Sequence, residues 1–267
     1  MSSNSNRADG AEAPSVRAGR FTAKDNFNVP MIVFDLETTG INPFTDLPVS
    51  ASLLEFNPVT GEFWDDTESY FLIDPGCKIP DDAIAIHGIT TEMARRDGVP
   101  LEAAIEHIYD TIVGSNKPIV GMNIAYDLTM VDAVSRSLLG CRLSENTKAI
   151  DILVLDRHFD RYRSGSRKLS DLAQAYGVEQ ENAHNAQGDT TTTAKVLSSM
   201  IKVYPEITDF DISELVESQK EWHYDWASSY SDWRKQNGKS PLAEEDFQWP
   251  IRRPPEERRD DSIGPHR

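Results

Sequence analysis

The stretch MIVFDLETTG at residues 31–40 places two acids, Asp35 and Glu37, at the end of an apolar run. Side chains two positions apart in a strand point to the same face, so the two carboxylates share one side of the chain. The residue between them, Leu36, carries no charge. The first question that this sequence raises is therefore what stabilises two like charges there.

The chain beyond this stretch predicts an α/β fold. The expected elements, in order, are strands over 31–37, 50–56 and 62–73, a loop over 74–98, a helix over 100–115, a strand over 117–123, a helix over 126–139, a strand and helix within 148–159, and helices over 169–177, 186–203 and 209–236. Three meander strands followed by alternating helices and strands are typical of a mixed sheet with flanking helices.

Composition restricts the possible functions. The chain has 267 residues and a net charge of −17, which argues against a broad surface for polyanions and favours local basic patches or bridging metal ions. Its two cysteines, Cys77 and Cys141, form no CxxC pair, so a zinc ribbon or a disulfide framework is not indicated. No apolar run is long enough to span a membrane. We expect a cytoplasmic protein without a membrane partner.

The sequence divides into four expected parts. Residues 1–28 and 250–267 lack apolar periodicity and are predicted to be disordered tails. The main folded domain covers 29–208, and a helical extension covers 209–249. Three tryptophans of that extension, at spacings of four and seven, favour a docking face over a platform for nucleobases.

Two further acids occur where helices are expected to begin. Asp127 follows the turn in GMNIAYD, and Asp189 follows the turn in AHNAQGD. A helix that begins at the carboxyl edge of a sheet places its first residues over that edge, where Asp35 and Glu37 also end their strand. The four carboxylates are therefore expected to converge.

A cluster of this kind repels itself unless divalent cations occupy it. Oxygen ligands without cysteine select hard ions, so we expect two Mg²⁺ or Mn²⁺ ions. Such a pair stabilises the attacking and the leaving oxygen in phosphodiester hydrolysis. His184, five residues before Asp189, titrates near neutral pH and is the candidate general base.

Three segments together resemble a known family. DLETTG at 35–40, NIAYD at 123–127 and HNAQGD at 184–189 are similar, in order and spacing, to the three motifs of the DEDDh, or DnaQ-like, 3′-to-5′ exonucleases. This family includes the proofreading subunit of bacterial DNA polymerase III. The resemblance extends over residues 31–205 and implies a ribonuclease H-like fold, in which helices flank a mixed five-stranded sheet.

The resemblance also implies roles for the acidic residues. Asp35, Glu37 and Asp189 match the ligands of a first metal ion. Asp35 then bridges to a second ion, which Asp127 assists mostly through water. His184 matches the general base. Asp151, on a later strand, is expected to support the site or cap its strand rather than to bind metal directly.

Substrate contacts are expected beside these motifs. Thr38, Thr39 and Gly40 bring backbone close to a phosphate or base, since glycine permits close approach, although a plain turn explains them nearly as well. His87 and Ile89 lie in a segment that resembles the family's contact with the terminal nucleotide, and a simple loop wedge is the alternative.

Two departures from the family pattern concern the substrate. Met122 stands before Asn123 where the family often has histidine, and Ser50 lies near a place where it often has glutamate. Asn123 remains a candidate substrate contact. Because neither departure removes a metal ligand, they affect the expected substrate preference rather than catalysis.

A basic segment at 157–168 offers a second kind of contact. Arg163 and Arg167 are candidates to bind phosphate groups in an otherwise acidic chain. A solvated loop is the alternative, because Asp156 and Asp160 offset part of the charge.

The expected function is removal of nucleoside monophosphates from the 3′ end of single-stranded or frayed DNA, with a polymerase as a candidate partner. DNA is favoured over RNA as the substrate. Two alternatives stay open: a ribonuclease of the same superfamily that trims RNA 3′ ends, and a catalytically silent scaffold on a polymerase.

Overall fold

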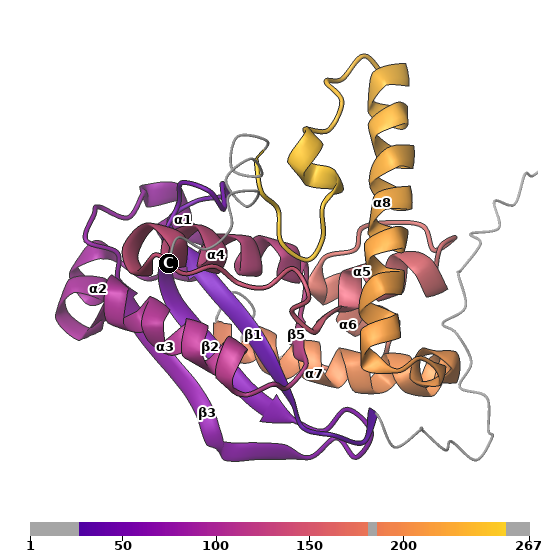
Figure 1. Cartoon of the computed structure of the whole chain (residues 1–267), viewed down its shortest axis with the longest axis horizontal. Coiled ribbons are helices and arrows are strands. Elements are labelled where there is room, and N and C mark those ends of the chain that lie inside the picture. Colours follow the sequence, from indigo (N-terminus) through magenta and orange to yellow (C-terminus); the bar gives the residue numbers. More distant parts are fainter. Residues whose placement is uncertain (1–26, 181–185, 255–267) are drawn as a thin grey trace, which may run out of the picture.

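The computed structural model describes residues 27–180 and 186–254 and contains one mixed sheet between helices (Figure 1). Its strands are β1 (Met31–Thr38), β2 (Pro48–Phe56), β3 (Phe63–Asp74), β4 (Val99–Pro100), β5 (Ile119–Gly121) and β6 (Ala149–Asp151). Its α-helices are α1 (Asp81–His87), α2 (Thr91–Asp97), α3 (Leu101–Gly114), α4 (Ile124–Leu139), α5 (Ile152–Phe159), α6 (Leu169–Ala175), α7 (Ala186–Val203) and α8 (Ile212–Gln236). Two 3-10 helices, η2 (Pro205–Asp209) and η3 (Glu244–Phe247), flank α8.

The strand order is β4-β3-β2-β1-β5-β6. The meander β1-β2-β3 is antiparallel, whereas β5 pairs in parallel with β1 and β6 in parallel with β5. The predicted fold class, a mixed sheet flanked by helices with an extra helix near the carboxyl end, is confirmed. The two-residue strand β4, which pairs in parallel with β3, adds a sixth strand to the five expected.

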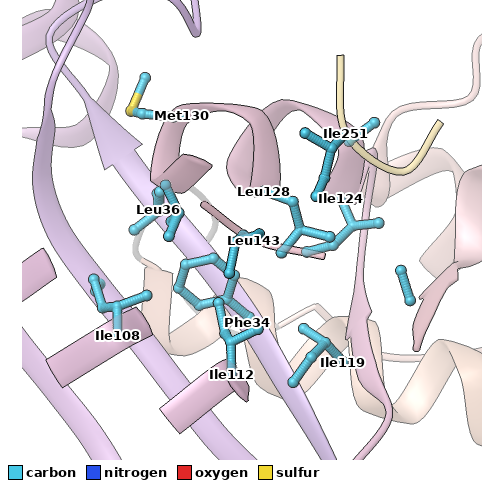
Figure 2. Close-up of a cluster of buried hydrophobic side chains, with 14 of the residues drawn as sticks. Phe34, Leu36, Ile108, Ile112, Ile119, Ile124, Leu128, Met130, Leu143 and Ile251 are labelled. Atoms are coloured by element: carbon cyan, nitrogen blue, oxygen red, sulfur yellow. The ribbon is translucent and has the colours of Figure 1, made fainter. Parts of the chain in front are cut away.

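Alternation along β1 divides the core into two layers. Ile32, Phe34 and Leu36 face α3 and α4, where Figure 2 shows Phe34 and Leu36 among the isoleucines of α3 and the residues of α4. Met31 and Val33 face the other side, where they pack with α7. The next two side chains on the α7 side are Asp35 and Glu37, so this face changes from apolar to acidic toward the carboxyl end of β1.

Two short helices replace the loop that the sequence predicts over 74–98. The hydroxyl of Thr90 accepts a hydrogen bond from Met93 N and caps α2, and Gly88 ends α1 in the left-handed conformation with φ of 77°. Each helix has seven residues, which is too short to give a clear helical period. Their apolar side chains pack in a small cluster with Ile79.

Helix α8 docks on the main domain and then extends past the other helices (Figure 1). The Trp222 ring stacks on His158 with ring centroids 3.8 Å apart, and Arg157 lies over the Trp226 ring at 3.5 Å from its centroid. The buried amide of Gln219 accepts a hydrogen bond from Asp151 N at 2.8 Å and donates one to Ala149 O at 3.2 Å. These contacts favour the interpretation of the tryptophans as a docking face.

After α8 the chain returns over α4 as a segment that we call the strap, residues 248–254. Trp249 and Ile251 are buried in the core layer of α3 and α4. Arg253 is 5% exposed and donates hydrogen bonds to Asp132, at 3.2 Å, and to Leu143 O, at 2.8 Å.

The folded region extends past both limits expected from the sequence. Phe27 was expected in the amino-terminal tail, but it is fully buried in the α7 layer. At the other end, the strap includes buried residues that were expected in the second tail. Residues 1–26 and 255–267 of the two predicted tails lie outside the described residues. Among the helices that are described, none has the length and apolarity that a membrane span requires.

Candidate active site

Three carboxylates meet where β1 ends beneath α7. Asp35 and Glu37 share one face of β1, and Asp189 lies in the first turn of α7. One carboxylate oxygen from each of these residues lies within 4.8 Å of the others. All three side chains are partly exposed, so the group is open to a ligand.

A fourth carboxylate, Asp127, lies at the same edge from the α4 side. It is 5% exposed, in the first turn of α4, and its Oδ1 accepts a hydrogen bond from Leu36 N at 3.1 Å. Leu36 lies between Asp35 and Glu37, so this bond fixes α4 directly against the acidic end of β1. Three of the four predicted carboxylates therefore meet at this edge, and Asp127 lies near enough for its charge to raise the pKa of Asp35.

The carboxylates raise one another's pKa values. Burial raises the pKa of Asp35 well above its ordinary value, and the charges of Asp127, Glu37 and Asp189 raise it further. Burial, with the Asp189 charge, raises the pKa of Glu37 to about 7. Burial also raises the pKa of Asp127 strongly, although the bond from Leu36 N opposes it. The cluster thus holds protons tightly unless cations replace them.

These residues fit divalent cations. The cluster offers only carboxylate oxygens, which hard ions such as Mg²⁺ and Mn²⁺ prefer. Cations at this edge would supply the positive charge whose absence raises the pKa values.

Asp151 supports the site without joining the cluster. Its Oδ1 accepts hydrogen bonds from Leu153 N, which caps α5, and from Asn123 N, each at 2.9 Å. Asn123 has φ of 59° and is exposed at the start of α4. Asp151 thus has the supporting role that the sequence suggested, although it caps helix α5 rather than its strand, and through Asn123 it fixes the helix that carries Asp127.

The segment at Thr38–Gly40 forms a tight turn held by side chains. Thr38 Oγ1 and the Tyr126 hydroxyl both donate to Gly40 O, at 2.7 and 2.5 Å. Thr39 Oγ1 accepts from Leu47 N at 3.0 Å. A Cβ atom at Gly40 would lie 2.5 Å from a carboxylate oxygen of Asp46, so a larger residue there would require the Asp46 side chain to shift. The turn explains these residues without a ligand, while Thr38 and Gly40 stay partly exposed beside the cluster.

His87 and Ile89 lie in different environments in the structure. Ile89 is 5% exposed and packs in the cluster below α1 and α2, which indicates a packing role. His87 Nδ1 accepts from Ile89 N at 3.0 Å, and its Nε2 is buried without a hydrogen-bond partner among the described residues. The Thr38 carbonyl lies near enough to raise the pKa of His87 slightly against the dominant effect of burial, which lowers it. His87 thus lies beside the end of β1.

The proposed phosphate contacts of Arg163 and Arg167 are not supported. Arg163 donates to both carboxylate oxygens of Asp156 at 2.7 Å and to Asp160 at 2.9 Å. Arg167 pairs with the same Asp156 carboxylate and donates to Asp160 O at 2.7 Å. Because Asp156 is fully buried, the two guanidinium groups neutralise an internal charge and hold the loop after α5.

Three more residues bear on the site: the predicted general base and two polar residues on the face of the sheet that carries the cluster. His184 lies outside the described residues, so its role stays a prediction. Ser50 and Tyr70, on β2 and β3, face the same side of the sheet as Glu37 and Asp35. Sequence reasoning named Ser50 only as a departure from the family pattern and did not name Tyr70, although the period of two in the meander would have placed both on that face once the register was known.

The profile of the RNase_T exonuclease family matches residues 32–197, a range that includes the whole carboxylate cluster. The chain belongs to this family. The resemblance to the DEDDh exonucleases is thereby confirmed.

Curated relatives in this exonuclease family are longer proteins. The chain is 28% identical over 174 residues to DNA polymerase III PolC-type of Pediococcus pentosaceus, which covers 64% of this chain and 11% of that protein. It is 25% identical over 213 residues to the 3′-5′ exonuclease DinG of Staphylococcus haemolyticus, covering 79% of this chain and 22% of DinG. With exodeoxyribonuclease I of Buchnera aphidicola the identity is 24% over 200 residues, 67% of this chain and 48% of the relative. The chain thus spans less than half of each of these proteins.

Solved structures share the exonuclease fold. Escherichia coli exonuclease I in complex with a dA16 oligonucleotide aligns with a TM-score of 0.56 and 21% identity, over 67% of this chain and 42% of that one. A 3′-exonuclease that recognises the histone mRNA stem-loop aligns with a TM-score of 0.54 and 15% identity, over 64% of this chain and 81% of that one. At these identities the likeness is one of fold.

Proposed function

We propose that this protein is a metal-dependent 3′-to-5′ exonuclease that removes nucleoside monophosphates from single-stranded or frayed DNA. The observation that carries the proposal is the convergence of Asp35, Glu37 and Asp189, with Asp127 beside them, inside the region that matches the exonuclease family. A cluster of like charges that burial and repulsion both oppose has no evident structural purpose.

The roles of the chain's own residues follow from this arrangement. Asp35, Glu37 and Asp189 would hold one divalent ion, and Asp35 with Asp127 would hold a second. Bound Mg²⁺ or Mn²⁺ ions would stabilise negative charge on the attacking and leaving oxygens. His184 would accept the proton of the attacking water.

Substrate positioning is proposed for the groups beside the cluster. The turn that contains Thr38, Thr39 and Gly40 lies at the end of β1, with His87 next to it and Asn123 exposed at the start of α4. These groups would line the path of a nucleic-acid strand whose 3′ end enters the cluster. Ile89 would act indirectly, by packing beneath the helix that carries His87.

DNA is favoured as the substrate over RNA. The relatives with the higher sequence identity are a PolC-type DNA polymerase and DinG, and exodeoxyribonuclease I is a further relative. The PolC-type relatives also support a polymerase as a candidate partner. RNA trimming is the second candidate, since one protein of the same fold recognises a histone mRNA stem-loop.

The test is degradation of matched substrates. Single-stranded DNA, duplex DNA and RNA of one sequence, each labelled at the 5′ end, are incubated with the protein in Mg²⁺, in Mn²⁺ and in EDTA. We expect single-stranded DNA to shorten stepwise from its 3′ end faster than the other substrates. This shortening should occur in Mg²⁺ and in Mn²⁺, should be absent in EDTA, and should release nucleoside monophosphates. Faster shortening of RNA would instead select the ribonuclease alternative. No shortening of any substrate would overturn the proposal and favour the scaffold.

A further inference from the structure

A polar row crosses the meander on the α7 side of the sheet. Asp35 on β1 pairs with Ser52 on β2, which pairs with Tyr70 on β3. Residues that are directly opposite in neighbouring strands point to the same face. Glu37 pairs in the same way with Ser50. Tyr70 therefore faces the same side as the carboxylate cluster, two strands away from Asp35.

The Tyr70 phenol lies near enough to Ser50 and Glu37 for both residues to shift its pKa. Burial raises the pKa of the Tyr70 phenol, the Glu37 charge raises it further, and the Ser50 hydroxyl opposes the increase. Glu37 and Ser50 are one residue pair in the β1-β2 register. Tyr70 thus shares a sheet face with Glu37, whose charge it feels, and 39% of the residue is exposed.

The Ser50 hydroxyl leaves a hydrogen-bonding position unfilled. Ser50 is fully buried, and its Oγ makes no hydrogen bond of ordinary geometry with any residue in the described part of the chain. Its neighbour Ser52, by contrast, shares a hydrogen bond of 3.0 Å with Thr190 Oγ1, next to Asp189. Buried hydroxyls usually have a partner, and the Ser50 hydroxyl lies near enough to the Tyr70 phenol to lower its pKa, so these two neighbouring hydroxyls keep hydrogen-bonding capacity for a ligand.

A phosphate needs donors that the cluster lacks. Ionised carboxylates only accept hydrogen bonds, so Asp35, Glu37 and Asp189 offer nothing directly to a phosphate oxygen. Tyr70 is a neutral donor at the edge of this acidic group. Tyr70 is partly exposed to solvent, and it lies on the face of the sheet that carries Asp35 and Glu37.

We propose that Tyr70 is a substrate-positioning residue whose hydroxyl donates a hydrogen bond to a phosphate oxygen of the terminal nucleotide, with Ser50 orienting the phenol. This inference rests on the proposed function and adds a phosphate contact that the three sequence motifs do not contain. Since the contact is to a charged group, its loss is expected to weaken phosphate binding about tenfold or more.

The test compares Tyr70→Phe, which removes only the hydroxyl, with Tyr224→Phe as the matched control. Tyr224 is 56% exposed on α8. The first measurement is the affinity of each protein for thymidine 5′-monophosphate and for thymidine in Mg²⁺. We expect Tyr70→Phe to bind the monophosphate about tenfold more weakly while thymidine affinity and the melting temperature stay unchanged, and Tyr224→Phe to behave as wild type.

The second measurement is the single-turnover rate against the concentration of single-stranded DNA. We expect Tyr70→Phe to raise the half-saturating concentration, and a Ser50→Ala variant to give a smaller increase. If Tyr70→Phe lost affinity for thymidine and for its monophosphate by the same factor, the phosphate contact would be overturned. The contact would also be overturned if the wild-type protein were active and Tyr70→Phe bound and cleaved as the wild type does. A wild-type protein that neither binds the monophosphate nor shortens DNA would overturn the proposed function itself, and this inference with it.

Discussion

The ionised carboxylates of the cluster destabilise the fold in the absence of cations. Asp35, Glu37 and Asp127 all have raised pKa values, because burial and neighbouring charges oppose ionisation. Repulsion between these carboxylates lowers the stability of the fold, and bound cations would relieve that repulsion. In a structural ion pair, by contrast, the protein itself supplies the opposite charge.

The first prediction concerns ligand removal. Asp35→Asn and Asp189→Asn should each abolish DNA shortening, since each removes a proposed metal ligand. Their melting temperatures in EDTA should equal or exceed that of wild type, because a repelling charge has been removed. The control Asp110→Asn, at an exposed position of α3, should keep wild-type activity. Normal turnover in either cluster variant would contradict the metal assignment.

The second prediction follows from the raised pKa of Glu37. A carboxyl whose pKa is about 7 in the folded protein, against 4.5 ordinarily, contributes most to stability below pH 4.5. That contribution decreases as the pH rises toward 7 and is lost above it. In EDTA, Glu37→Gln should therefore stabilise the protein at pH 8 by about 1–2 kcal/mol, with allowance for partial exposure, and give little or no gain at pH 4.5. Urea unfolding at both pH values measures this difference, and an equal gain at both would refute it.

The third prediction concerns His184, and it rests on the sequence. If His184 accepts the proton of the attacking water, His184→Ala should lower kcat by about 10²- to 10⁴-fold and leave affinity for DNA nearly unchanged. The wild-type rate should rise with pH as the imidazole loses its proton and then level off. Single-turnover rates across pH, in saturating Mg²⁺, measure both effects. An unchanged rate and pH profile in the variant would assign the base elsewhere.

Sequence reasoning identified the acidic residues more reliably than their neighbours. Asp35, Asp127 and Asp189 were predictable because each lies at the end of a strand or the start of a helix, and these ends meet at one sheet edge. Tyr70 was not, because its place beside Glu37 depends on the register of two strand pairs. Register is set by tertiary packing as well as by turn geometry.

At the level of the element, the loop after α5 is organised around one buried charge. Asp156 is fully buried and receives Arg163, Arg167 and the Tyr176 hydroxyl, the last at 2.8 Å. The sequence showed arginines with two acids nearby, but not that the chain folds back to pair them. Composition alone therefore suggested a phosphate-binding patch where the structure contains an internal ion-pair network.

The fourth prediction reverses the sequence-based expectation for this segment. Arg163→Ala combined with Arg167→Ala should destabilise the fold by about 3–5 kcal/mol, because Asp156 would be left buried without an opposite charge. The salt dependence of DNA binding should not change. Arg161→Ala, at an exposed position in the same segment, is the control and should leave stability unaltered. A flatter salt dependence in a stably folded double variant would restore the phosphate contact.

At the level of the whole molecule, the parts outside the family match complete the core. The match ends at residue 197, but α8 contacts α5 and β6, and the strap buries Trp249 and Ile251 against α4. Sequence patterning predicted α8 from its helical period. It did not predict the strap, because a segment rich in proline and arginine has no period that reveals burial.

The fifth prediction tests the strap as part of the fold. Arg253→Met should destabilise the protein by about 3 kcal/mol, since Asp132 would keep only the more distant guanidinium group of Arg142, at 3.7 Å, inside the core. Arg96→Met, at an exposed pair with Asp97, should change stability by less than about 1 kcal/mol. Thermal and urea unfolding compare the two. Equal small effects would mean that the strap docks without contributing to stability.

Gln219 protects the edge of the sheet at β6 from pairing with a second molecule of this protein. A primary amide presents the same N–H and C=O groups as a peptide, so its bonds to Asp151 N and Ala149 O occupy the outer side of β6 as a neighbouring strand would. At the opposite edge, β4 is only two residues long and includes Pro100, which has no N–H to donate. The edge at β6 therefore offers no long row of unpaired backbone groups to a second chain, whereas at the other edge β4 pairs with only Ile73 and Asp74 of the twelve residues of β3. The β6 edge should therefore resist strand addition by a second chain, and Gln219→Leu should open that edge to it.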